Sequence, residues 1–100
     1  MTDKSWVNLL GLMQRARKIV TGEELVVKAI QKKRVVFVII AADASDNTKK
    51  KVTDKCHYYE IPYIFFEDRY VIGQAIGKAE RVTVGLVDKG FANKFRSLIE

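Results

Sequence analysis

The apolar residues of the first third of the chain recur at the spacing of amphipathic helices. A first stripe at the i, i+3, i+4, i+7 spacing consists of Trp6, Leu9, Leu10, Met13 and Ala16. Thr2 or Ser5 is placed to cap this helix, and Arg15 falls where the carbonyl end of the helix dipole favours positive charge. A second stripe consists of Leu25, Val26, Ala29 and Ile30. The second helix is therefore expected to end at the basic residues 32–34.

Four apolar segments have the composition of β-strands. Residues 35–41 are β-branched and apolar without alternation, which is typical of a central strand covered on both faces. Residues 61–66 predict a second strand, with Pro62 near its start, where a missing amide does little harm. Residues 82–87 predict a third strand and residues 19–20 a very short one. Helices must therefore cover both faces of the sheet.

The remaining segments predict three more helices. Asp46 or Asn47 is the expected cap of a third helix. Its inward face consists of Val52, Cys56 and Tyr59. A short helix after the 61–66 strand is expected to end at Gly77, and Asp88 is expected to cap a terminal helix. The buried face of that last helix consists of Phe91, Phe95, Leu98 and Ile99.

Helices and strands thus alternate along the chain. This order predicts an α/β fold, a three-layer α/β/α sandwich with a mixed sheet of about four strands. A chain of 100 residues with 48% apolar content is enough for one core, so we expect a single domain over residues 1–100.

The net charge of +6 is concentrated near the N-terminus. Between residues 1 and 34, Lys or Arg occupies positions 4, 15, 17, 18, 28, 32, 33 and 34, against acids at 3, 23 and 24. The remainder is nearly balanced. A basic third beside a neutral remainder favours a polyanion-binding face, and nucleic acid is the usual polyanion for a small domain.

Several other classes of function are disfavoured. The longest apolar run, residues 35–42, is too short to span a bilayer, and the N-terminus lacks the apolar core of a signal peptide, so we expect a cytoplasmic protein without a membrane partner. The single cysteine, Cys56, excludes an internal disulfide and a multi-cysteine zinc site. No dinucleotide fingerprint, P-loop or metal-ligand cluster is present, and we expect no cofactor, no metal and no small-molecule substrate.

Cys56 and His57 are the only neighbouring nucleophile and base. Adjacent residues on a helix point about 100° apart, so these two side chains cannot face each other. We interpret Cys56 as a core residue and His57 as a surface residue, and we expect no enzymatic activity.

The stretch 17–28 joins a basic segment to a glycine and the opening turn of the second helix. Gly22 stands where the N-cap is expected, so the amides that follow point outward as unpaired donors. Glu23 and Glu24 complement the positive end of the helix dipole, and Glu24 shares a face with Lys28 four residues later. This pattern is typical of an RNA-facing edge, but an ordinary solvated helix also begins this way, and the spacing leaves both readings open.

In this order, the segments resemble the kink-turn RNA-binding ribosomal-protein family, the L7Ae and L30e group, and particularly its small bacterial members. The resemblance covers nearly the whole chain. It rests on Lys18-Ile19 followed by Gly22 and Lys28-Ala29, on the apolar strand running into Ala42-Asp43-Ala44, on Cys56 before residues 60–64, and on residues 72–77 with their two glycines.

The resemblance implies an α/β/α sandwich that binds a sharply bent RNA, made of a three-nucleotide bulge flanked by tandem sheared G·A pairs. The first turn of the second helix would enter the major groove at those pairs, and the loop before the last strand would cover the bulge. The residues implied in RNA binding are Arg17, Lys18, Gly22, Glu23, Glu24, Lys28, Ala42, Asp43, Ile76, Gly77, Lys78 and Arg81. Of these, residues 22–24 and Lys28 would face the G·A pairs, Arg17 and Lys18 the phosphates, and residues 76–81 the bulge.

One position departs from the family. Where the family often has Gly-Thr-Asn-Glu, the Asn and Glu positions are occupied by Glu24 and Leu25, and leucine cannot accept a hydrogen bond from a base. Either Glu24 takes that acceptor role, or the protein reads its RNA with fewer base contacts. A protein-interaction or regulatory module on the same fold therefore stays open as the alternative. We expect a monomer when free; the sequence does not identify the RNA, whether ribosomal, a messenger leader or another transcript.

Overall fold

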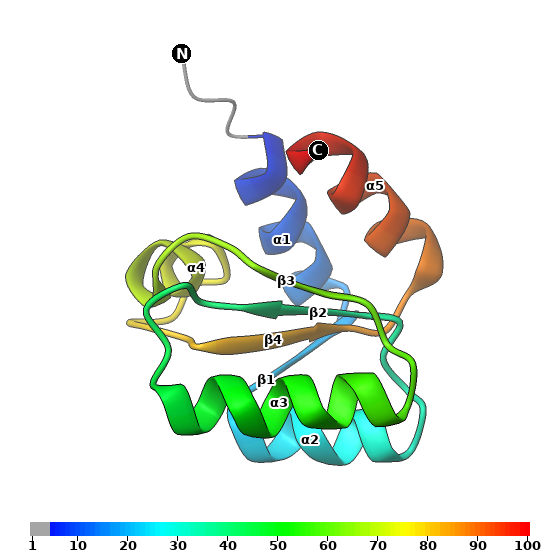
Figure 1. Cartoon of the computed structure of the whole chain (residues 1–100). Helices are drawn as coiled ribbons and strands as arrows, with labels where there is room; N and C mark the ends of the chain where they lie inside the picture. The colour runs from blue at the N-terminus through cyan, green and yellow to red at the C-terminus, as the bar shows by residue number, and fades with distance from the viewer. Residues whose placement is uncertain (1–4) are drawn as a thin grey trace.

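A four-stranded sheet separates two layers of helices in the computed structural model, which describes residues 5–100 (Figure 1). The elements in chain order are α1 (Ser5–Arg15), β1 (Ile19–Thr21), α2 (Glu23–Gln31), β2 (Phe37–Ile40), α3 (Asp46–Tyr58), β3 (Tyr63–Phe65), α4 (Arg69–Ala75), β4 (Thr83–Leu86) and α5 (Lys89–Ile99). The strand order is β1-β4-β2-β3; β2 and β3 are parallel, and β4 is antiparallel to both of its neighbours. The predicted α/β/α sandwich with a mixed sheet is confirmed.

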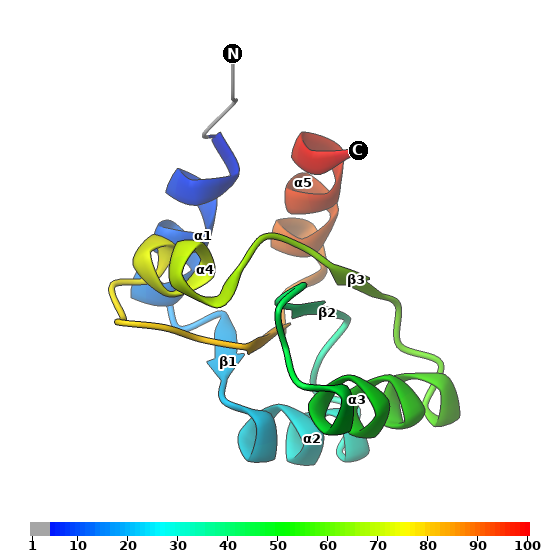
Figure 2. The same cartoon turned by 60° about the vertical axis from the view of Figure 1, so that its left-hand side comes forward.

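Each face of the sheet is covered by its own apolar cluster. Helices α1, α4 and α5 lie over one face and α2 and α3 over the other (Figure 2). Along β2, Phe37 and Ile39 join the first cluster while Val38 and Ile40 join the second, because successive side chains of a strand point to opposite faces. Both faces of β2 are therefore buried, which explains its unbroken apolar sequence and confirms the predicted central strand.

Two residues predicted to lie in the core, Leu25 and Ala16, are exposed, so these two predictions are wrong. Leu25 is 59% exposed, and Val27 is buried in its place. Helix α2 packs on both the sheet and α3, so its buried side consists of residues 26, 27, 29 and 30. Leu25 lies outside this side and faces solvent. Ala16 is exposed because α1 ends one residue earlier.

The helix caps agree with the sequence to within a residue. Ser45, rather than Asp46 or Asn47, caps α3, because the chain is still extended at Ser45 and its hydroxyl accepts from Thr48 N at 3.2 Å. Asp88 caps α5 as predicted, accepting from Phe91 N at 2.8 Å. Of the two proposed caps of α1, Ser5 is the first described helical residue, and Thr2 lies outside the described residues.

Four helices end in the same way, with a residue in the left-handed conformation. Gly77 ends α4 as predicted, with φ 75°, and the amide of Lys78 donates to Gly73 O at 2.8 Å. Arg17, Lys33 and Glu60 occupy the equivalent positions after α1, α2 and α3, with φ between 56° and 59°. The amide after each donates back to a carbonyl of the last helical turn, as in a Schellman motif. The left-handed residue and this hydrogen bond together determine where each of the four helices ends.

None of the helices described in residues 5–100 combines the length and the apolar character needed to cross a bilayer.

Candidate nucleic-acid interface

The N-terminus of α2 lacks a side-chain cap. Gly22 is the N-cap residue, with φ 97° and ψ 140°, and no side chain bonds to the first-turn amides. Its own amide donates to Thr83 O at 3.1 Å, which holds the start of α2 against the start of β4. A Cβ added at Gly22 would meet no atom within 4 Å, so glycine is required here by the backbone conformation and not by crowding.

Beside this helix start lies a hollow of about 360 Å³. Its lining comes from β1, the start of α2, α3 and the segment leading into β4, and consists of Thr21, Gly22, Glu23, Thr48, Glu80, Arg81, Val82 and Thr83. The structure thus brings together parts of two segments predicted to bind RNA, residues 22–23 of the segment 22–24 and residues 80–81 of the segment 76–81. The hydroxyl of Thr83 is buried without a hydrogen-bond partner in the described chain, so the wall of the hollow contains an unsatisfied polar atom.

The carboxylate of Glu23 faces α3. Glu23, Val27 and Ile30 share the buried side of α2, so Oε1 accepts from Thr48 Oγ1 at 2.6 Å and Oε2 from Lys51 Nζ at 3.2 Å. The Thr48 hydrogen bond is the main reason why the pKa of Glu23 lies below its usual value; Lys51 lowers it further and burial opposes both. The ionised side chain of Glu23 thus joins α2 to α3.

Glu24 and Lys28 lie on the solvent side of α2. Both are exposed and four residues apart, as the sequence predicts. Neither forms an ion pair with any residue of the described part of the chain. Their charged groups are therefore available to a partner that approaches the first turns of α2.

Arg81 ties the loop between α4 and β4 to β1. Its Nε lies 3.3 Å from Thr21 Oγ1 and its Nη1 donates to Glu80 O at 2.7 Å. The loop also packs tightly on α4, since a Cβ added at Gly73 would lie 2.6 Å from the Cα of Glu80. Gly77 and Lys78 are exposed at the start of the loop, whereas the side chain of Ile76 is only 4% exposed and belongs to the core. Only the backbone of Ile76 can therefore contribute to the surface.

Asp43 is held by Arg69, the first residue of α4. Asp43 accepts from Arg69 N at 3.1 Å and from Arg69 Nε at 3.2 Å, and its carbonyl accepts from Arg69 Nη2 at 2.8 Å. Arg69 also lies 3.9 Å from Glu80, so it joins the turn after β2 to the α4–β4 loop. Ala42 is exposed beside Asp43.

Four residues of this surface were not predicted from the sequence: Thr48, Lys51, Arg69 and Thr83. No local pattern identifies Thr48, Lys51 and Arg69, because their partners Glu23, Asp43 and Glu80 lie on other elements. Thr83 has no side-chain partner among the described residues, and only its place beside the hollow distinguishes it.

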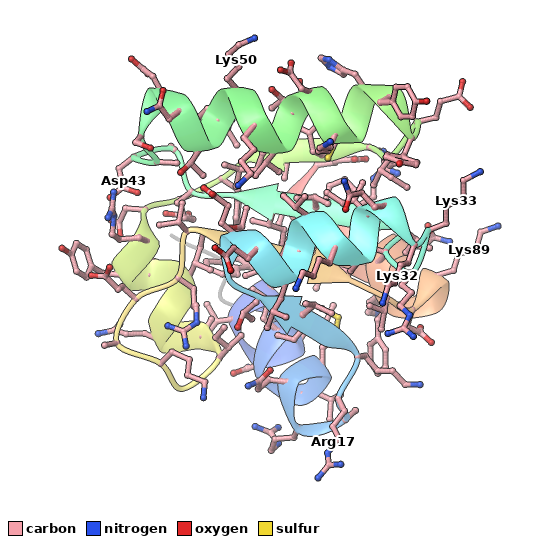
Figure 3. The ribbon with its side chains drawn as sticks, turned by 90° about the horizontal axis from the view of Figure 1, so that it is seen from below. Arg17, Lys32, Lys33, Asp43, Lys50 and Lys89 are labelled. Carbon is pink, nitrogen blue, oxygen red and sulfur yellow. The ribbon has the colours of Figure 1, made fainter. Side chains whose placement is uncertain are left out.

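Arg17 and Lys18 stand apart from this surface. Lys18 O accepts from Val87 N at 3.0 Å, next to the end of β4, whereas Gly22 bonds to Thr83 at the start of β4. The structure therefore separates the two basic residues from the hollow by the length of β1 (Figure 3).

The described residues contain no cluster of three or more His, Cys, Asp or Glu side chains able to hold a metal ion. Cys56 is fully buried, and this burial raises the pKa of its thiol to about 11, so the thiolate is scarce at neutral pH. His57 is turned to the surface, with Nε2 3.2 Å from the hydroxyl of Tyr63.

Comparison with known proteins gives consistent matches over the whole chain. The model of the ribosomal protein L7Ae/L30e/S12e/Gadd45 family matches residues 4–96. A Bacillus subtilis (strain 168) protein named RNA-binding protein YlxQ is 53% identical over 100 residues, covering 100% of both chains. An Enterococcus faecium protein of the same name is 49% identical over 94 residues, covering 94% of this chain and 90% of the relative.

Two solved structures have the same fold. A protein of unknown function from Bacillus halodurans is 49% identical, with a TM-score of 0.92, and the match covers 97% of this chain and 98% of that one. A Giardia lamblia 15.5kD RNA binding protein is 19% identical, with a TM-score of 0.77 over 99% of this chain and 88% of that one, a likeness that shows the fold alone.

Proposed function

Because the chain belongs to the ribosomal protein L7Ae/L30e/S12e/Gadd45 family, we propose that it is a non-catalytic RNA-binding protein that recognises a kink-turn. The observation that carries the proposal is the meeting of an uncapped helix start, at Gly22, with a hollow walled by the α4–β4 loop. Two relatives that match 94% or more of this chain are named RNA-binding proteins, which supports the RNA partner.

The first turn of α2 supplies the contacts to the G·A pairs. Its free amides donate, Lys28 donates from the exposed side of the helix, and Glu24 accepts. Glu24 is the better acceptor because Glu23 is already engaged with Thr48 and Lys51. Glu24 therefore replaces the acceptor that Leu25 cannot supply, and Glu23 keeps the helix start in place.

The hollow receives a bulged nucleotide. It has room for a base beside the Arg81 guanidinium, and Gly77 and Lys78 are exposed in the same loop that contributes Glu80 and Arg81 to its lining. Asp43 and Arg69 contribute indirectly, by holding the loop that forms one wall.

Binding favours the bent RNA without any chemical step. A kink brings phosphates close together, and a protein that contacts the bent form better than the open one shifts the equilibrium by that difference in affinity. Ribosomal RNA or a messenger leader containing such a kink would be a suitable partner, and the protein acts as a monomer in this scheme.

The test is a titration of the purified protein with a kink-turn RNA and with the same RNA after its G·A pairs are changed to Watson–Crick pairs, each at two salt concentrations. We expect tight binding that depends on the G·A pairs. Equal, salt-sensitive binding to both RNAs would reduce the protein to a general polyanion binder. Binding to neither would favour the protein-interaction module.

A further inference from the structure

Exposed cations gather at the end of the sheet remote from Gly22. There β1 begins, β4 ends and β2 begins, because Lys18 O accepts from Val87 N at 3.0 Å and Leu86 O accepts from Val36 N at 2.8 Å. The last turn of α2 and the first turn of α5 reach the same end. We call this surface the basic end; its residues are Lys18, Lys32, Lys33, Arg34 and Lys89. In Figure 3, Lys32, Lys33 and Lys89 project from one side of the molecule and Asp43 lies on the opposite side.

The charge of the basic end is not neutralised within the protein. No residue of the basic end forms an ion pair within residues 5–100. The nearby carboxylates are Asp88, which caps α5, and Glu60. At the hollow, by contrast, Lys51 is paired with Glu23, and Arg69 with Asp43 and Glu80. The basic end therefore contains five cations without an ion-pair partner in the described residues, whereas at the hollow two of the cations are paired and Arg81 is not.

Helix stability explains only part of this cluster. Lys32 and Lys33 follow the C-terminus of α2, where the dipole favours cations, but Lys89 is the first residue of α5, where the dipole disfavours them. Lys33 also has φ 56°, in a position where glycine is usual. Arg17 and Glu60 have the same conformation after α1 and α3, so Lys89 is the residue placed against local preference, here that of the helix dipole.

The surface beside Lys89 is concave. A hollow of about 270 Å³ lies between the start of β2 and α5, and Lys89, Asn93 and Arg96 contribute to its lining. The Arg96 guanidinium lies 4.9 Å from the centre of the Phe37 ring, which holds it at the wall, and it forms an exposed ion pair with Glu100 at 3.6 Å. Cations around a concavity suit the phosphates of a nucleic-acid backbone, which attract Lys and Arg whatever the base sequence.

The exposed side of α2 connects the two surfaces. Lys28 and Lys32 are four residues apart on that side, and Gly22 lies about 15 Å from Lys32 along the helix axis. We propose that the basic end is a second RNA-binding surface, which contacts the phosphate backbone of a helical RNA segment independently of its sequence. This proposal depends on the proposed function in one respect only, which is that the polyanion is RNA.

The test uses a straight RNA duplex without G·A pairs, titrated over a range of salt concentrations. The variant Lys32→Gln/Lys33→Gln/Lys89→Gln is compared with Lys49→Gln/Lys50→Gln/Lys55→Gln, which removes the same charge from α3 and leaves Lys51 in place. We expect the first variant to bind the duplex at least tenfold more weakly, with a log–log salt slope shallower by about 2. We expect the α3 variant to change affinity less than threefold. The variant Lys32→Arg/Lys33→Arg/Lys89→Arg should bind like the wild type, and thermal unfolding should show that all variants are folded.

An equal loss in both glutamine variants would mean that only net charge matters and would overturn the proposal, as would wild-type affinity in the basic-end variant. Preference for the G·A-containing kink-turn is measured separately on the wild type. If the wild type shows no preference for the kink-turn, the proposed function is refuted, but the duplex experiment can still be interpreted. If the wild type shows this preference, the basic-end variant should show it too.

Discussion

The two glutamates that follow Gly22 are adjacent in sequence but have different environments. Glu23 is turned to α3 and accepts from Thr48 and Lys51, whereas Glu24 is exposed beside Lys28. A helix turns by about 100° per residue, so neighbours at its start face different partners. Glu23 therefore joins α2 to α3, whereas the carboxylate of Glu24 is open to a partner.

Lys28 and Lys18 should differ in what they contribute to RNA binding. We expect Lys28→Ala to cost about 1–3 kcal/mol of binding free energy and to erode selectivity for G·A pairs. Lys18→Ala should mainly flatten the salt dependence, because Lys18 lies at the other end of β1. Titrations of both variants with the kink-turn RNA and its Watson–Crick counterpart measure the difference. If both variants weakened all RNAs equally, base contact by Lys28 would be refuted.

Thr83 and Thr48 should respond oppositely to replacement by valine. The Thr83 hydroxyl is buried without a partner, so Thr83→Val should raise the free energy of unfolding by about 1 kcal/mol. Thr48→Val removes the donor to Glu23 and should lower stability by about 1 kcal/mol.

Urea unfolding of both variants provides the measurement. Destabilisation by Thr83→Val as large as that by Thr48→Val would show that the Thr83 hydroxyl is satisfied in solution.

At the scale of elements, the walls of the candidate site depend on how α4 meets the loop that follows it. Arg69 at the start of α4 bonds to Asp43 after β2 and lies near Glu80 in the loop. Gly73, in the middle of α4, allows the backbone of Glu80 to approach closely. The loop is therefore positioned by contacts with the start and the middle of α4.

Gly73→Ala should displace this loop. The added Cβ would lie 2.6 Å from the Cα of Glu80, and backbone cannot move aside as a flexible side chain does. We expect a loss of stability of about 1–3 kcal/mol, as for other overpacked sites, together with weaker binding of kink-turn RNA. Gly90→Ala is the control, because its Cβ would meet only the end of the Asp88 side chain at 3.3 Å. Unchanged stability and RNA affinity in Gly73→Ala would argue against close packing of loop and helix.

The whole molecule has two apolar clusters, one on each face of the same sheet. Because small domains usually unfold in one cooperative transition, we expect both clusters to unfold together. Cys56 belongs to the cluster under α2 and α3 and is fully buried. Its thiol is therefore a probe of global opening.

The thiol of Cys56 should make stability depend on pH in the alkaline range. Burial raises its pKa from 9.0 to about 11, so the folded protein holds this proton more tightly than the unfolded chain does. The resulting contribution is fully present below pH 9 and is lost as the pH rises towards 11. Urea unfolding of the wild type should show this decline, and Cys56→Ala should remove the part of this decline that is due to the thiol.

A thiol reagent should label Cys56 at neutral pH only as fast as the protein unfolds. Rapid labelling of the native state would contradict the burial of Cys56.

Much of the architecture could be predicted from local patterns. The order of elements, the central strand (predicted over residues 35–41 and observed at Phe37–Ile40), the cap at Asp88 and the end of α4 at Gly77 all follow from spacing and from single-residue preferences. Leu25 shows the limit of this approach. Its apolar side chain fits a helical stripe, but the direction in which α2 packs on the sheet and on α3 decides which side of the stripe is buried.

Local sequence is enough to establish the α/β alternation, the burial of both faces of β2 and the glycine at the start of α2, because each depends on periodicity or on the backbone freedom of one residue. Three other relations appear only in the folded chain: Glu23 bonds to α3, Arg69 joins Asp43 to Glu80, and Lys18 and Lys89 share an end of the sheet remote from Gly22. These relations connect residues far apart in the chain. They arise from strand order and register, which local sequence does not encode.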